Sequence, residues 1–303
     1  MNDVKLQPLK VADVENLLAN ESSEEMVEMK DLAKSTISTG MIMDAIETSE
    51  EADVANENMQ AALENNRMMQ IQAMMAADDD IKLVDILQTT QHSTLILMSR
   101  AENVTKMSDL DGCRIGTWKV GFSEIPHMIV EEQMLDIEWI KIINPLNLYI
   151  SGAIDATLAK SYNELILFAM SGITPGSILH FSEHDYDFPE DGVFVSEEYY
   201  KNNKEKCRLF AEASRKGWDW VRNNREEAIE IVMKYVKNAN VPTNKYNQKW
   251  MLETILEAQE DVKGGLPSYK LNEDAFNEMN EALKKYGYIS KPISYERFLG
   301  GKL

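Results

Sequence analysis

Three neighbouring residues, Tyr162, Asn163 and Glu164, combine an aromatic ring, an amide and a carboxylate directly after the apolar run IDATLAKS. An aromatic ring stacks on flat molecules, a contact worth about 0.5 to 1.5 kcal/mol beyond its buried area. An amide and a carboxylate can bond to the donors on the edge of a heterocycle. The trio therefore predicts binding of a flat, neutral or amine-bearing ring. The other interpretation is structural, because Tyr and Asn near a helix start also pack and cap.

Similar side chains stand at the other predicted strand ends. Trp118 ends the run CRIGTW, Glu124 follows at the start of a predicted helix, and His92 precedes the run STLILMS. In open α/β sheets, ligands bind beyond the carboxyl ends of the strands. We therefore expect a single ligand site made of these residues, the trio and one residue of an acidic loop: Trp118, Glu124, Tyr162, Asn163, Glu164, His92 and Asp187.

The elements that must position these residues are short apolar runs separated by polar turns. The pattern predicts buried strands at 81–87, 93–99, 113–118 and 137–143, and a helix at 122–135. Alternation of such strands with helices is typical of an α/β sheet. After residue 196 the pattern is mostly helical; Thr243 and Asn272 are predicted N-caps, and the helix after Asn272 buries Phe276, Met279 and Leu283.

Length and charge bound the function. The chain has 303 residues and a formal net charge of -20, so it is long enough for about two domains and repels nucleic acid. No apolar run approaches the roughly 18 residues that a membrane span needs, and residues 1–20 lack a signal-peptide pattern. We expect a soluble globular protein that does not bind nucleic acid.

Aromatic residues are distributed unevenly. All of them lie from Trp118 onward, whereas residues 1–117 contain 12 of the 18 methionines. One interpretation is a helix-rich segment packed by methionine, which fills irregular gaps. The other is that the sequence of this segment has been redesigned.

Motifs for enzymatic or metal chemistry are absent from the sequence. It has no nucleophile elbow, P-loop, dinucleotide fingerprint or HExxH motif. His180 and His184 are four residues apart, but their surroundings do not read as a helix, so a metal pair is disfavoured. The acidic cluster around them reads as a solvated loop or hinge rather than a calcium site: Glu183, Asp185, Asp187, Glu190 and Asp191. Cys113 and Cys207 read as free thiols.

Three ordered segments carry a resemblance to a known family. STLILMSRAENVTKMSDLDGCRIGTW, SGAIDATLAKSYNEL and the stretch beginning DGVFVSEEYY together resemble the NMT1/THI5-like, or SsuA-like, substrate-binding proteins of ABC transporters, over roughly residues 84–298. The resemblance implies an α/β fold of two lobes hinged by two chain crossings, the flytrap of type II periplasmic binding proteins, with a helical C-terminal region. Lobe one is expected at 1–97 plus 191–303, and lobe two at 98–190. Residues 1–80 lack the aromatic strand and Gly- and Tyr-rich helix start usual in the family.

The resemblance also implies a function without catalysis or cofactor. The protein is expected to capture a small heteroaromatic ligand between its lobes, a thiamine pyrimidine precursor or a riboflavin-like ring, and to deliver it to an ABC transporter permease. It is expected to be a monomer in the periplasm, or outside the cell on a lipid anchor, with the signal segment absent from this chain. Two alternatives stay open: a remodelled scaffold without a native ligand, and a thiamine-pyrimidine synthase-like enzyme, which the missing cysteine cluster disfavours.

Overall fold

A computed structural model gives the structure for most of the chain after residue 69. It describes residues 70–78, 81–118, 122–142, 145–183, 186–238, 243–262 and 264–301. Residues 1–69 lie outside the described residues, so both interpretations of the methionine-rich segment stay untested there. His184 and Asp185 also lie outside the described residues.

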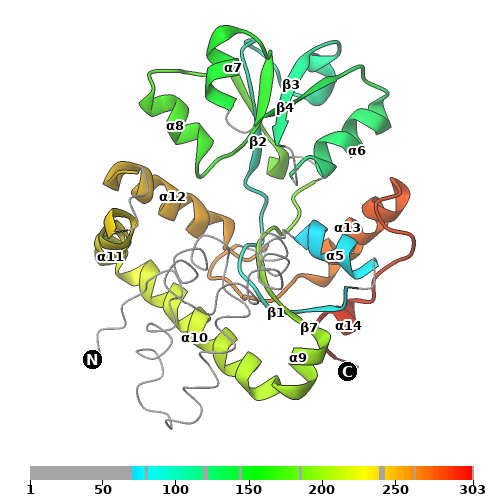
Figure 1. Ribbon diagram of the computed structural model, residues 1–303, viewed down its shortest axis with the longest axis vertical. Helices are drawn as coiled ribbons and strands as arrows, with labels where there is room; N and C mark the ends of the chain where they lie inside the picture. Colours follow the sequence, from blue (N-terminus) through cyan, green and yellow to red (C-terminus); the bar gives the residue numbers. More distant parts are fainter. Residues whose placement is uncertain are drawn as a thin grey trace, which may run out of the picture.

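Lobe two is built on a five-stranded sheet in the order β4-β3-β5-β2-β6 (Figure 1). Strand β3 is parallel to β4 and β5, whereas β2 is antiparallel to β5 and β6. The strands and helices of this lobe are β2 (Leu95–Ser99), η1 (Met107–Leu110), β3 (Arg114–Trp118), α6 (Glu124–Gln133), β4 (Glu138–Ile142), α7 (Pro145–Ser151), β5 (Ala156–Lys160), α8 (Glu164–Met170), β6 (Ser177–His180) and η2 (Phe181–Glu183).

Both faces of this sheet are buried, and β2 shows why. Leu95 and Leu97 belong to the apolar cluster that contains Ile125 of α6, whereas Ile96 and Met98 belong to the cluster of α7 and α8. Successive side chains of a strand point to opposite faces, so an unbroken apolar run fills both layers. This is the physical reason why the run predicted at 93–99 folds as a central strand.

Lobe one surrounds the antiparallel pair β1 and β7. Three phenylalanine rings form part of its core, with Phe298 packed against Phe194 and Phe276 at centroid distances of 6.0 and 5.4 Å. Its described elements are α5 (Gln70–Asp78), β1 (Leu83–Gln88), β7 (Gly192–Ser196), α9 (Glu197–Asn202), α10 (Lys204–Asn223), α11 (Arg225–Asn238), α12 (Lys245–Ala258), α13 (Glu273–Lys285) and α14 (Tyr295–Phe298).

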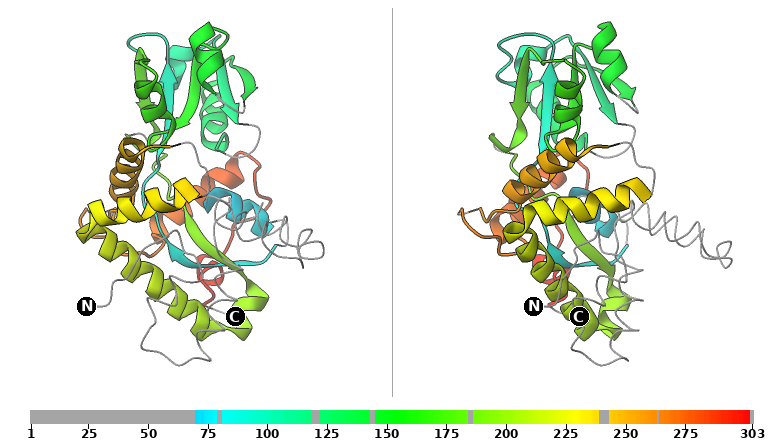
Figure 2. Two further views of the ribbon diagram at one scale, coloured as in Figure 1. Left: turned by 60° about the vertical axis from the view of Figure 1, so that its left-hand side comes forward. Right: turned by 90° about the vertical axis from the view of Figure 1, so that its left-hand side faces the viewer.

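Two chain crossings join the lobes, one from β1 to β2 and one from η2 to β7 (Figure 1). The turned views show the same two-lobed outline, with α12 of lobe one lying next to α8 of lobe two (Figure 2). The predicted fold class, a two-lobed α/β binding-protein fold with a helical C-terminal region, is confirmed.

The predicted lobe boundaries stay a prediction. The boundary at 97/98 falls inside β2, and every residue of β2 pairs within the lobe-two sheet. We therefore propose that the first crossing ends before Leu95. The second boundary, at 190/191, falls just before β7.

The predicted helix caps are right in one case and wrong in another. Asn272 caps α13 by accepting a hydrogen bond from the backbone of Ala275. The cap of α12 is Asn244 rather than Thr243, because it is the Asn244 side chain that accepts the backbone N–H of Asn247. Among the described residues, no helix combines the length and apolar character that crossing a bilayer requires.

Candidate functional site

The carboxyl ends of β3 and β5 lie at the same edge of the lobe-two sheet, because the two strands are parallel. Trp118 ends β3 and Lys160 ends β5. Strand β2 enters from lobe one, and its first residue, Leu95, pairs with Lys160. The edge that carries Trp118 and Lys160 therefore faces lobe one (Figure 1).

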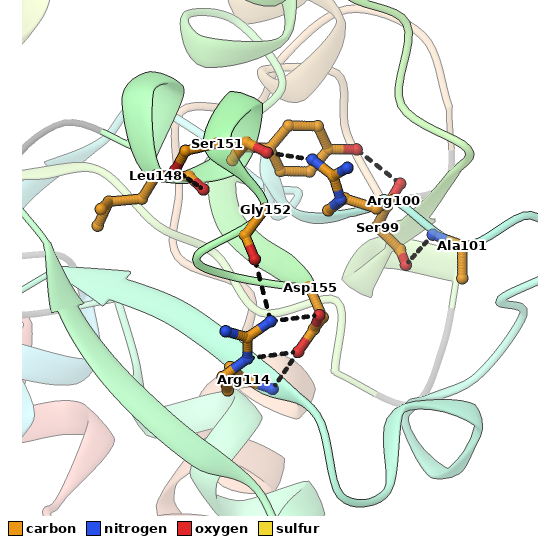
Figure 3. A network of polar contacts seen from close by, with 9 residues as sticks. Ser99, Arg100, Ala101, Arg114, Leu148, Ser151, Gly152 and Asp155 are labelled. Atoms are coloured by element: carbon orange, nitrogen blue, oxygen red, sulfur yellow. Dashed lines mark hydrogen bonds and ion pairs between the residues drawn. The ribbon is translucent and has the colours of Figure 1, made fainter.

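The opposite edge is held by a polar network (Figure 3). Arg114 at the start of β3 donates to both carboxylate oxygens of Asp155, at 3.0 and 2.9 Å, and to the carbonyl of Gly152 at 3.0 Å. The Tyr149 hydroxyl of α7 donates to the carbonyl of Ser99 at 2.8 Å. This network ties the outer ends of β2, β3 and β5 to α7, which gives the edge facing lobe one a firm support.

An aromatic pair follows β3. Trp118 and Phe122 meet edge to face with ring centroids 5.2 Å apart, and the Lys160 ammonium lies 4.7 Å from the centroid of Phe122. Phe122 has a φ of 64°, which is the left-handed region that non-glycine residues rarely adopt. Strained backbone of this kind persists where the surrounding structure fixes it, often at functional sites.

Glu124 begins α6 with its carboxylate buried. The side chain is 8 % exposed, and its Oε2 has no hydrogen-bond partner among the described residues. Burial, together with the charges of Glu124 and Glu131, raises the pKa of Tyr288 to about 12. Tyr288 follows α13, so an aromatic hydroxyl of lobe one lies in the field of this lobe-two carboxylate. An unpartnered buried carboxylate oxygen is costly, so a donor that reached it would be bound favourably.

The trio Tyr162, Asn163 and Glu164 stands after β5, as predicted. Glu164 is the first residue of α8; its Oε2 accepts the backbone N–H of Lys160 at 2.8 Å, and its Oε1 accepts the Asn163 amide at 3.2 Å. Two members of the trio thus also close their own turn. Burial, followed by the charges of Asp191, Glu190 and Glu164, raises the pKa of Tyr162 well above its ordinary value.

His92 and Asp187 lie in the two chain crossings and bind each other. His92 Nδ1 is 2.5 Å from one oxygen of Asp187, whose other oxygen accepts the backbone N–H of Ser93 at 2.8 Å. The Asp187 hydrogen bond is the first cause that raises the pKa of His92. These bonds join one crossing to the other, and a contact of either residue with a ligand stays a prediction.

Residues of the acidic cluster also bond to the two chain crossings. Glu190 forms a buried ion pair with Lys160 at 2.7 Å and accepts the hydroxyls of Ser93 and Thr94 at 2.8 and 2.5 Å. The carbonyl of Asp191 accepts the backbone N–H of Thr89 at 2.9 Å. The part of the chain that the structure describes contains no group of three or more His, Cys, Asp or Glu side chains placed to hold a metal ion.

Both margins of the inter-lobe contact carry bonds between the lobes. On one side the Trp250 indole of α12 donates to the carbonyl of Ser161 at 2.8 Å. On the other side Lys285 of α13 forms an ion pair with Glu132 of α6 at 2.7 Å, and Tyr186 donates to the same carboxylate at 2.8 Å. The lobes are therefore in contact on both margins.

The seven predicted residues thus form two groups. Five stand at the sheet edge that faces lobe one, and His92 and Asp187 stand in the crossings. The predicted ligand site did not include five residues that complete the arrangement: Phe122, Lys160, Glu190, Trp250 and Tyr288. The sequence did hold a signal for Lys160, because this lysine directly follows an apolar run. A lysine in such a place is buried only when an acidic side chain pairs with it. Trp250 and Tyr288 had none, because only the tertiary fold brings lobe one to this edge.

The solved structures that resemble this chain show its fold. The periplasmic sulfonate-binding protein SsuA from Methylobacillus flagellatus KT has a TM-score of 0.53 and 11% identity, with 76% of this chain and 70% of that chain covered. The desulfurization enzyme DSZB has a TM-score of 0.52 and 11% identity, with 78% of this chain and 82% of that chain covered. The fold is therefore found in a binding protein and in an enzyme.

A curated relative and a family model match the sequence itself. The formylaminopyrimidine-binding protein of Halalkalibacterium halodurans is 26% identical over 122 residues, which are 39% of this chain and 36% of that protein. The chain thus matches about a third of the length of this relative. The model of the NMT1/THI5-like family matches residues 37–228, more than half of the chain. The chain therefore belongs to the NMT1/THI5-like family.

Proposed function

We propose that this protein is the solute-binding component of an ABC importer. It captures a small heteroaromatic ligand that carries hydrogen-bond donors, such as a thiamine pyrimidine precursor, between its two lobes and delivers it to the permease. It works as a monomer in the periplasm or on the outer surface of the cell, without catalysis. The name of the curated relative, a formylaminopyrimidine-binding protein, supports this ligand class.

The observation that carries the proposal is the combination of rings and an unpartnered carboxylate oxygen at one sheet edge. Trp118 and Phe122 offer ring faces and edges, and Glu124 offers a buried acceptor beside them at the start of α6. Tyr288 adds an aromatic side chain from lobe one. A flat ring with an amino group stacks on the rings and donates to the carboxylate, so one ligand satisfies both features.

The charges at this edge favour donors over anions. Burial is the largest cause of the raised pKa values of Tyr162 and Tyr288, and the charges that add to it are all carboxylates. The nearby cation, Lys160, is already paired with Glu190. Among the described residues at this edge, a sulfonate meets carboxylates, and Lys160 is already engaged by one of them. We therefore propose that this chain does not share the sulfonate specificity of its structural neighbour.

The test is binding measured by tryptophan fluorescence and thermal melting. The probes are thiamine, its aminopyrimidine and formylaminopyrimidine precursors, riboflavin and an aliphatic sulfonate. We expect a saturable response to one donor-bearing ring and none to the sulfonate. Substituting Glu124→Gln is expected to weaken binding roughly 10- to 100-fold, because a hydrogen bond to a charged group is worth about 1.5 to 3 kcal/mol.

Two comparisons make the test decisive. Glu227→Gln carries the same chemical change on the exposed side of α11 and is expected to bind like the parent protein. Trp118→Ala is expected to lose binding while still melting cooperatively. If the parent protein melts cooperatively but binds none of the probes, the remodelled scaffold is favoured instead. Turnover of a bound probe would favour an enzyme.

A further inference from the structure

A cavity lies entirely within lobe one. It has a volume of about 430 Å³ and is bounded by β1, α9, α10, the segment 268–270 and Leu299. Its α10 wall is one helix face, because the residues concerned recur every three or four positions: Lys204, Cys207, Arg208, Ala211, Glu212 and Arg215. The volume is in the range of roughly 300 to 1,000 Å³ that is usual for small-molecule sites.

The lining of this cavity includes a buried carboxyl group without a full set of partners. Asp85 of β1 is 4 % exposed; its Oδ1 accepts the backbone N–H of Leu87 at 2.9 Å, and its Oδ2 has no partner among the described residues. Burial raises the pKa of this carboxyl to about 7. Leu87, Cys207 and Tyr269 are buried around the same cavity. A polar group in such surroundings needs a hydrogen-bond partner, and the residues described do not supply one for Oδ2.

The rim of the cavity is cationic in a chain whose net charge is -20. Lys204, Arg208, Arg215 and Lys270 line it, together with the half-buried acid Glu212. Arg208 is engaged by Glu205 and Glu212, at 2.6 and 2.9 Å. Arg215 and Lys270 make no ion pair within the described part of the chain. Guanidinium and ammonium groups gathered around one opening attract an anion.

We propose that this cavity is a second ligand site, which takes a small organic anion with its carboxylate or phosphate at the rim and a hydroxyl or amino donor directed at Asp85. The site is independent of the proposed function, because every residue that lines it belongs to lobe one. The cationic rim selects an anionic ligand, and Asp85 selects a ligand that carries a hydrogen-bond donor on its uncharged part.

Calorimetric titration of the full chain tests the proposal with three probes. Ribose 5-phosphate and gluconate combine an anionic group with hydroxyl donors and differ in the kind of anion, whereas ribose has the donors alone. We expect saturable one-to-one binding of at least one anion, weakened by added salt, and no binding of ribose. The anion that binds identifies whether phosphate or carboxylate is preferred.

Variants locate the binding. The exposed pair Arg215→Glu with Lys270→Glu is expected to weaken it about tenfold or more. The matched pair Lys234→Glu with Lys237→Glu makes the same charge change on α11 and is expected to bind normally, as is Trp118→Ala. Asp85→Asn is expected to weaken binding as well. The proposal is overturned if neither anion binds saturably, if both charge-reversal pairs lose binding equally, or if Trp118→Ala abolishes it.

Discussion

Lys160 connects the crossings to the aromatic pair at the sheet edge. Its ammonium is buried, pairs with Glu190 between the crossings, and lies against the ring of Phe122. A buried ion pair is weak evidence for stability by itself, but removing one partner leaves an uncompensated charge. Lys160 therefore contacts both the carboxylate of Glu190 and the ring of Phe122.

Lys160→Met is expected to lower the free energy of unfolding by about 3 to 5 kcal/mol, because it strands Glu190 in the interior. The double variant Lys160→Met with Glu190→Gln is expected to recover much of this loss. Denaturant melts of the parent and both variants provide the measurement. Equal destabilisation in the single and double variants would show that the charge of Glu190 is not the cause.

The His92–Asp187 bond makes the hinge sensitive to pH. Because Asp187 raises the pKa of His92 above 6.5, the protonated ring is favoured in the folded state. The backbone of Asp261 and the charge of Glu260 act in the same direction. The stabilisation is fully present below pH 6.5 and is lost as the pH rises through the folded pKa.

The difference in unfolding free energy between the parent and His92→Gln is therefore expected to be about 1 kcal/mol larger near pH 6 than near pH 9. Denaturant melts at the two pH values give this difference. Asp187→Asn serves as the comparison, since it removes the main cause of the shift and is expected to flatten the pH dependence. Parallel stability curves for the parent and His92→Gln would contradict the assignment.

At the scale of elements, β6 is held by a close approach of two backbones. The backbone N–H of Gly176, just before β6, donates to the carbonyl of Ser99 at 2.8 Å. A side-chain carbon at Gly176 would meet the backbone of Arg100 and Ala101 well inside van der Waals contact. Backbone atoms cannot turn aside as a flexible side chain can, so β6 would have to move.

Gly176→Ala is expected to destabilise lobe two by about 1 to 3 kcal/mol, as overpacking does. Gly112→Ala is the comparison: there the φ of 75° is unfavourable, but no atom lies within 4 Å of the added carbon. Its cost is expected to be about 1 kcal/mol from the backbone alone. Melting temperatures of the two variants show which one loses more stability. Gly112→Ala would lose more if the contact at Gly176 were easily relieved.

At the scale of the whole molecule, a few polar contacts join the two lobes. Lys285 and Glu132 bridge α13 and α6, and Trp250 bridges α12 and the turn after β5. The Lys285–Glu132 pair is exposed, so it contributes little to folding stability. It joins the two lobes, and if they open and close as we propose, a small energy is enough to shift that equilibrium.

Lys285→Glu is expected to open the ligand-free protein, seen as a larger radius of gyration in small-angle scattering, with the free energy of unfolding nearly unchanged. Lys249→Glu breaks a comparable exposed pair with Glu226, but within lobe one, and is expected to leave the shape unchanged. Identical scattering curves for Lys285→Glu and the parent would exclude the pair as a latch.

The local sequence determined the elements and the placement of the trio. The four apolar runs with predicted bounds matched β1, β2, β3 and β4 to within two residues at each end, because buried strand positions are mostly apolar. No bounds were predicted for β6 and β7. The helix after Asn272 followed from its cap and its buried stripe of Phe276, Met279 and Leu283. Trp118, Glu124 and the trio stand at the sheet edge that the strand-end rule predicted.

The tertiary structure decided what faces these residues. Lys160 pairs with Glu190, and Glu132 pairs with Lys285, only because the two crossings bring distant segments together. The hydrogen bond from Trp250 to Ser161 has the same origin. The cationic cavity likewise joins β1 to α10 and the segment 268–270. Local patterns report which face of an element is buried, because burial follows helical or strand periodicity. Local patterns do not predict which distant side chain will contact that face, because the contact depends on how the lobes pack.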